Sequence, residues 1–182
     1  MWFRPSLAAA EMRAPPRPTP VQAHFPQWRL IMASYDNDIS LLNSLIATTL
    51  DSVEGYRESA KDAEDPQLKS NFAERATERT QVVAMLRDQV RTLGGTPEDD
   101  GTVLGGAHRM FVNLKSMIVA RDDKAVLEEV QRGETYLMEK FETALNDRNA
   151  SPETLRVIEQ AHSQIASGSS AMQGLGSTTG SY

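Results

Sequence analysis

Apolar residues recur every three or four positions along most of the chain, which is the spacing of one face of an α-helix. Prolines, glycines and capping residues interrupt this pattern and divide it into five segments. The pattern predicts helices over about 36–65, 67–93, 101–120, 123–146 and 152–175. Asp36 or Asn37 is the expected cap of the first helix, Gly94-Gly95 the stop of the second, and Ser151-Pro152 the start of the last.

The residues that this spacing places on one face of each helix form the expected core. In chain order they are Leu42, Ile46, Thr49, Val53, Tyr56, Ala60, Leu68, Phe72, Ala76, Arg79, Val83, Leu86, Val90, Leu93, Ala107, Phe111, Leu114, Ile118, Val126, Val130, Gly133, Leu137, Phe141, Ala144, Leu155, Ile158, His162, Ile165, Ser169 and Met172. Arg79 and His162 are the ionisable members besides Tyr56, and a lone core histidine is more often a packing residue than a ligand.

Four of the segments are long, whereas the segment over about 101–120 is shorter and stands between the second and the fourth. At 1.5 Å per residue it spans roughly 30 Å, enough to run from one end of a bundle to the other. The expected fold is therefore all-α: a ferritin-like four-helix bundle of two hairpins, with a helical crossover and parallel central long helices.

The two ends of the chain differ from this helical body. Six of the nine prolines lie in the first 26 residues, and residues 1–35 carry four arginines and one glutamate. We predict a disordered Pro/Arg-rich extension at 1–35, a bundle at 36–175 and a flexible Gly/Ser tail at 176–182. Met32 is a plausible translation start, with 1–31 then an upstream extension; a membrane-surface arm is a weaker alternative.

Composition excludes several kinds of site. The 182 residues include no cysteine, which removes disulfides, cysteine-bound metals and thiol catalysis. The net charge of −6 divides into +3 on residues 1–35 and −9 on the rest, so a general nucleic-acid binder is not expected. No apolar run approaches the roughly 18–20 residues of a membrane span, and we expect a cytoplasmic protein.

Several short motifs occur in an order that resembles a known family. They are Glu54-Gly55-Tyr56, Ala76-Thr77-Glu78-Arg79, Leu93-Gly94-Gly95-Thr96-Pro97-Glu98, Ala107-His108-Arg109, Leu114-Lys115-Ser116, Leu127-Glu128-Glu129 and Arg132-Gly133-Glu134. Together they resemble the bacterial ferritin-like family called domain of unknown function 2383, over about residues 36–147. The resemblance implies a ferritin-like fold, and because the family has no established activity it implies no catalytic residues.

Ferritin-like di-iron proteins hold metal with a Glu from each of two helices and Glu-x-x-His from each of the other two. The corresponding candidates for an iron or manganese site are Glu54, Glu78, Glu134 (or Glu129), Glu159 and His162. The set is incomplete because Gln81 stands where the second helix would need histidine. Glu159 also lies about 9 Å along its helix from the layer of the other glutamates.

A second interpretation explains the same glutamates without metal. Arg75, Arg79 and Arg132 are placed to pair with them, and buried carboxylates usually persist only when they are paired. Simple surface charge is the third interpretation.

Two functions follow from these interpretations. The first is a non-enzymatic bacterial protein with no catalytic residues, structural, interaction-type or stress-associated, working as a homo-oligomer and most simply a dimer. The alternative is a di-metal (Fe/Mn) carboxylate protein with oxidase or iron-handling activity.

Overall fold

Helices make up nearly all of the chain that the computed structural model describes, residues 27–101 and 123–176, with side chains over 35–101 and 128–168. They are α1 (Gln27–Asp62), α2 (Pro66–Thr92), α4 (Asp123–Leu145) and α5 (Pro152–Gly176). The predicted all-α class is confirmed. The predicted crossover lies, apart from Gly101, outside the described residues, as do residues 1–26 and 177–182 of the predicted extension and tail.

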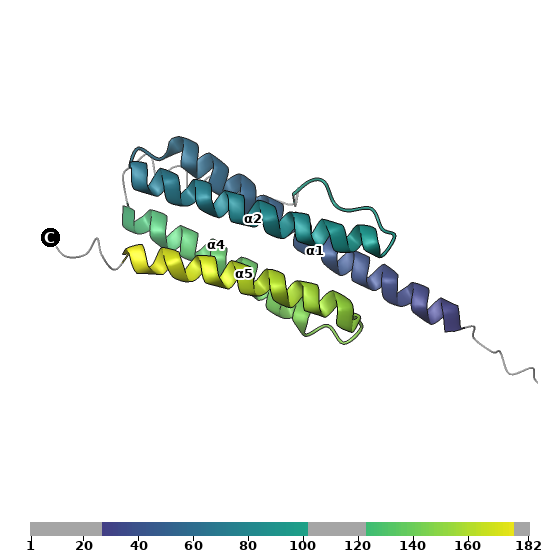
Figure 1. The fold of residues 1–182 in the computed structure, drawn as a ribbon. Coiled ribbons are helices and arrows are strands. Elements are labelled where there is room, and N and C mark those ends of the chain that lie inside the picture. Colours follow the sequence, from purple (N-terminus) through teal and green to yellow (C-terminus); the bar gives the residue numbers. More distant parts are fainter. Residues whose placement is uncertain (1–26, 102–122, 177–182) are drawn as a thin grey trace, which may run out of the picture.

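The helices form two antiparallel hairpins laid against each other, α1 with α2 and α4 with α5 (Figure 1). Contacts between the hairpins are made by α2 with α5 and by α1 with α4. As Figure 1 shows, α2 and α4 run in the same direction, so the predicted order of hairpin, long connection and hairpin is confirmed. No helix in the described ranges is both long and apolar enough to cross a membrane.

The helix ends follow the capping residues of the sequence. The carboxylate of Asp65 accepts hydrogen bonds from the amides of Gln67 at 2.6 Å and Leu68 at 3.0 Å, and Pro66 opens α2. The hydroxyl of Ser151 accepts from the amide of Thr154 at 3.2 Å. Gly94 ends α2 with φ of +79°, a conformation that favours glycine.

The first helix begins earlier than the sequence pattern predicts. It starts at Gln27, directly after Pro26, because residues 27–35 contain neither proline nor glycine. Asp36 and Asn37 therefore lie inside the helix, and their predicted role as its N-cap is wrong. The side chain of Asn37 instead donates to Asp147 beyond the end of α4, at 3.4 Å.

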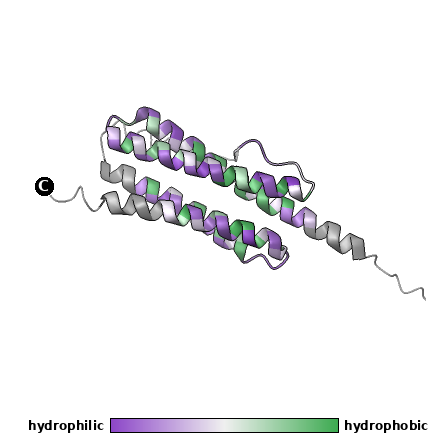
Figure 2. Ribbon diagram, viewed as in Figure 1, coloured by the Kyte–Doolittle hydropathy of each residue, from purple (hydrophilic) through white to green (hydrophobic). Residues whose placement is uncertain are grey.

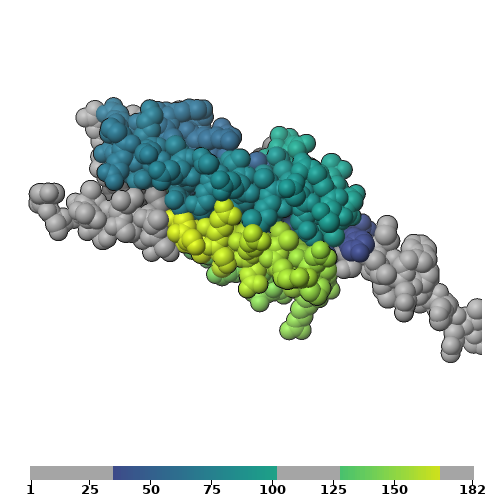
Figure 3. Space-filling model, viewed as in Figure 1, coloured from purple at the N-terminus to yellow at the C-terminus, as the bar shows by residue number. Residues whose placement is uncertain are grey.

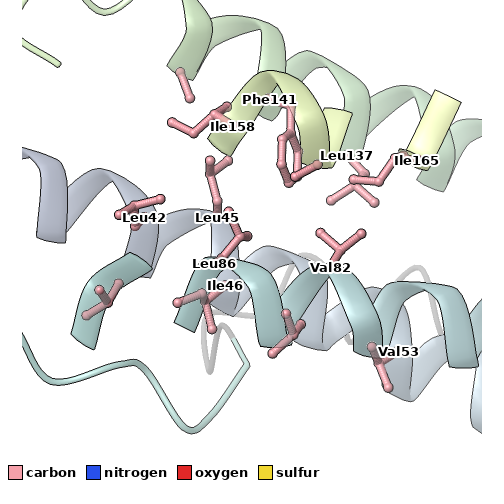
Figure 4. Packing of buried hydrophobic residues seen from close by; sticks show 14 residues of the cluster. Leu42, Leu45, Ile46, Val53, Val82, Leu86, Leu137, Phe141, Ile158 and Ile165 are labelled. Carbon is pink, nitrogen blue, oxygen red and sulfur yellow. The ribbon is translucent and has the colours of Figure 1, made fainter. Parts of the chain in front are cut away.

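The main apolar core is formed by all four helices, each of which carries hydrophobic and hydrophilic positions (Figure 2). Its members include Leu42, Leu45, Ile46, Val53, Val82, Leu86, Leu137, Phe141, Ile158 and Ile165 (Figure 4). A second cluster lies toward the α1–α2 turn and consists of Tyr56, Ala63, Phe72, Ala76 and Val130. Burying each large side chain contributes roughly 1.5–3 kcal/mol, so this packing is the main source of stability.

Candidate functional site

A layer of charged side chains crosses the interior of the bundle. Arg79 of α2 is fully buried and donates to Glu134 of α4 at 2.6 Å and to Glu78 at 2.7 Å. The hydroxyl of Tyr56 in α1 donates to the other carboxylate oxygen of Glu134 at 2.7 Å. Arg75 pairs with the second oxygen of Glu78. These five residues, which we call the Arg79 network, link three helices with two positive and two negative charges.

The position of Arg79 follows from the helical repeat. It stands three residues after Ala76 and four before Val83, so it must face the core with them. A guanidinium taken out of water is tolerated only when carboxylates pair with it. Its Nε atom is nevertheless buried without a hydrogen-bond partner.

The electrostatics of the network fix the protonation of its donors. Burial raises the pKa of Tyr56 well above its ordinary value, and the charge of Glu134 and the hydrogen bond to it raise it further. Burial alone would lower the pKa of Arg79, but the charge and hydrogen bond of Glu134 raise it above its ordinary value. At neutral pH Tyr56 is therefore a neutral donor and Arg79 a cation, and both donate to Glu134.

A glycine lets α5 approach this network. A Cβ atom at Gly168 would lie 2.0 Å from Nη1 of Arg75 and 2.4 Å from each carboxylate oxygen of Glu78, closer than real Cβ contacts occur. Gly168 was not predicted from the sequence, although a glycine inside a helical pattern often marks a close approach.

The structure separates the glutamates that the sequence grouped as metal ligands. Glu78 and Glu134 lie in the Arg79 network, whereas Glu54 and Glu159 are exposed on α1 and α5. His162 is partly buried, and its Nε2 atom has no hydrogen-bond partner. Within the described ranges, no three His, Asp or Glu side chains are grouped so that they could hold a metal ion. This donor set does not fit a ferritin-like di-metal centre.

The three arginines expected to pair with glutamates divide into two groups. Arg75 and Arg79 join the network, whereas Arg132 is largely exposed and pairs with the buried Glu129, three residues before it on α4. The second carboxylate oxygen of Glu129 is buried without a hydrogen-bond partner. Arg132 therefore forms its ion pair within one helix, outside the Arg79 network.

Asp38 forms a second buried polar contact between helices. Its carboxylate is fully buried in α1 and accepts from the amide of Ser151 and the hydroxyl of Thr154, both at 3.0 Å. These donors belong to the first turn of α5 and its cap, where free amides favour a negative charge. Asp38 was not predicted from the sequence, although it stands four residues before the core residue Leu42 and so lies on the same face of α1.

A shallow groove of about 360 Å³ lies on the outside of α2, lined among the described residues by Ser70, Ala73, Glu74, Thr77, Glu78 and Gln81. At its end, Gln164 of α5 donates to Gln81 at 3.2 Å. The described parts of α2 and α5 lie side by side on the face shown in Figure 3. Its described lining residues other than Ala73 are polar or charged, and its one network member, Glu78, is already paired with Arg75 and Arg79.

Fold and interior together define an all-α four-helix bundle whose core contains a charge-balanced ion-pair network. The chain belongs to the family described as domain of unknown function (DUF2383), whose model matches residues 37–147, from α1 through α4. The resemblance noted in the sequence is thereby confirmed. No curated protein matches the chain. Membership in this family assigns no specific function.

Proposed function

We propose that this protein has a non-enzymatic role in the bacterial cell, as a structural or interaction component that acts through its surface. One observation carries the proposal: Arg79 donates to both the partly buried Glu78 and the buried Glu134, two of the glutamates that a ferritin-like metal centre would need. Tyr56 donates to the remaining oxygen of Glu134.

Coordination chemistry supports this proposal. A carboxylate that binds Fe²⁺ or Mn²⁺ must direct free lone pairs at the cation. In the Arg79 network those lone pairs accept hydrogen bonds, and the guanidinium is permanently charged and repels a second cation. General acid–base chemistry also needs a group that can exchange its proton with a substrate, whereas both donors to Glu134 are buried.

The proposed partner is a second copy of the chain, in a homo-oligomer that is most simply a dimer. Tyr35 and Tyr136, 41% and 44% exposed, are the large apolar side chains most open to solvent in the described ranges. Aromatic residues are enriched at protein interfaces. Light scattering coupled to size exclusion should give twice the monomer mass, and Tyr136→Ser should lower it if α4 contributes to the interface. A monomer mass for the unmodified chain would contradict this part of the proposal.

Metal loading tests the proposal directly. The full chain is incubated with Fe²⁺ or Mn²⁺ under anaerobic conditions, freed of excess metal and analysed by elemental mass spectrometry. We expect less than about 0.2 metal ions per chain, because the part of the chain that the structure describes offers no group of three His, Asp or Glu side chains that could hold a metal ion. Binding that approaches two ions per chain and is lost in Glu134→Gln, but retained in Glu139→Gln, an exposed carboxylate of the same helix, would overturn the proposal in favour of the di-metal function.

A further inference from the structure

The first helix is longer than the bundle to which it belongs. α1 has 36 residues, whereas α2, α4 and α5 have 27, 23 and 25. The ends of the other helices reach α1 at three consecutive residues: Asn37 contacts the turn after α4, Asp38 the start of α5, and Ile39 the turn after α2. Residues 27–36, which we call the overhang, continue α1 beyond this level for about 15 Å (Figure 1).

The overhang is rich in apolar residues for a helix that leaves the bundle. Its ten residues read Gln-Trp-Arg-Leu-Ile-Met-Ala-Ser-Tyr-Asp, of which five are large and apolar or aromatic. At about 100° per residue, positions 28, 31, 32 and 35 share one face of the helix. The same face continues into the bundle through Ile39 and Leu42, which pack in the main core. In the overhang its described member, Tyr35, is 41% exposed.

The order of residues on this face is the same when it is read from either end. An aromatic residue stands at each end, Trp28 and Tyr35, and two apolar residues, Ile31 and Met32, stand midway between them. A second copy laid antiparallel therefore sets Trp28 opposite the partner's Tyr35 and Ile31 opposite the partner's Met32, each twice. A two-fold symmetric interface requires such a reciprocal pattern, in which the same patch of both subunits is complementary to itself.

The two charged residues of the overhang are complementary in the same arrangement. Arg29 and Asp36 both lie on one edge of the apolar face, about 100° and 80° round the helix from Trp28. Like edges of two antiparallel helices lie side by side, so each Arg29 comes within about two residues, or 3 Å along the axis, of the partner's Asp36. Opposite charges therefore meet at two symmetric places, and the charge pattern favours a second copy as the occupant of this face.

We propose that the overhang is the homodimer interface, in which residues 28–35 of α1 pair antiparallel with the same residues of a second copy. This inference rests on the homo-oligomer of the proposed function and names its surface. The two bundles then lie at opposite ends of the paired helices, and the apolar face that α1 carries out of each bundle is covered. The interface has fewer residues than the roughly 20–30 a side of a standard complex, so we expect a dissociation constant in the micromolar range.

Sedimentation equilibrium of the full chain, from about 1 to 100 μM, tests this proposal. Ile31→Asp sets a charge at the centre of the paired face in both copies and should weaken dimerisation at least about 100-fold. Ala33→Asp is the matched control, because Ala33 stands about 150° round the helix from that face, and it should change the dissociation constant less than about threefold. Both positions lie beyond the bundle, so the free energy of unfolding of the monomer should be the same in both variants.

Exchanging the charges tests the antiparallel arrangement itself. Arg29→Asp brings like charges together at both symmetric places and should raise the dissociation constant about tenfold. The double variant, Arg29→Asp with Asp36→Arg, restores opposite charges and should return the constant to within about threefold of its original value. The antiparallel interface is overturned if the double variant dimerises no better than Arg29→Asp.

The remaining outcomes distinguish this inference from the proposed function. If the unmodified chain is a monomer throughout, the proposed homo-oligomer and the overhang interface both fail, whereas metal loading still decides the non-enzymatic role. If it is a dimer that Tyr136→Ser disrupts and Ile31→Asp does not, the interface lies on α4 and the overhang proposal alone is overturned. If a monomeric chain binds anionic phospholipid vesicles and Ile31→Asp abolishes that binding, the face meets a membrane surface, which also overturns the proposal.

Discussion

Replacing Arg79 with alanine should destabilise the bundle by about 3–5 kcal/mol, the usual cost of breaking a buried ion pair by removing one partner. The side chain of Arg79 is 0% exposed and that of Glu134 is 7% exposed. Truncation leaves Glu134 with the Tyr56 hydroxyl as its remaining donor in the network, in a site from which water is largely excluded. It also leaves a cavity in the core stripe, which raises the cost.

The magnitude can be worked from the two bonds that are lost. Arg79 donates at 2.6 Å to Glu134 and at 2.7 Å to Glu78, and hydrogen bonds to charged groups contribute about 1.5–3 kcal/mol each. Two such bonds agree with the range expected for breaking the pair. A domain of this size is stable by roughly 5–15 kcal/mol, so the change should be large and easy to measure.

Equilibrium unfolding in guanidinium chloride, followed by helical circular dichroism, measures this free energy. Arg91→Ala is the matched control, because Arg91 lies on the same helix and pairs with Asp88 at the exposed surface. An exposed pair of this kind contributes at most about 1 kcal/mol. The second comparison is a triple variant, Tyr56→Phe with Arg79→Met and Glu134→Leu, which replaces the buried ion pair and the tyrosine that donates to it. Its free energy of unfolding should be unchanged or higher, because no buried charge is left unpaired.

Two results would refute the reasoning. If Arg79→Ala costs no more than Arg91→Ala, the guanidinium is not held in a dry interior. If the triple replacement is as destabilising as Arg79→Ala alone, the cost comes from lost packing and not from an unpaired carboxylate.

Three further predictions concern single positions. The pKa of Tyr56 is raised in the folded protein, so the stabilising effect of its hydroxyl is complete below the ordinary tyrosine pKa of about 10 and is lost as the pH rises through the raised pKa. In a phenolate absorbance titration Tyr56 should therefore ionise after the exposed tyrosines, and Tyr56→Phe should remove that late step. Gly94→Ala should cost about 1–2 kcal/mol in chemical denaturation, because φ is +79°, and Gly94→Asn should cost less. Gly168→Ala should change the free energy of unfolding by no more than about 1 kcal/mol, because the gain in helix propensity is offset by displacing the side-chain ends of Arg75 and Glu78; a larger loss would mean that these side chains cannot move aside.

The helices and their core could be predicted because local rules determine them. Phe72, Leu86, Phe141 and Ile165 lie on the predicted stripes and are buried. The same spacing placed Arg79 on the core face, which is confirmed. The caps at Asp65 and Ser151 involve residues two or three positions apart, so the sequence contains all the information that forms them.

The grouping of the glutamates could not be obtained in the same way. Estimating depth along a helix says which turn a residue occupies but not which way it faces. Glu54 stands two residues before the buried Tyr56, a rotation of about 200°, and is accordingly exposed. Asp38 was missed for another reason: its partners Ser151 and Thr154 are more than a hundred residues away, and only tertiary packing brings them to it.

The carboxylate contacts of Glu134 and Asp38 between the two hairpins also explain how four similar helices reach one arrangement. Apolar stripes tolerate a slide of one helical turn, because the repeat presents another apolar residue about 5.4 Å further along. Such a slide would carry Glu134 out of reach of Arg79 and leave a buried charge without its partner, which costs far more than imperfect apolar packing. Asp38 imposes the same condition on the start of α5. We therefore interpret the Arg79 network and Asp38 as the residues that set the register between the hairpins.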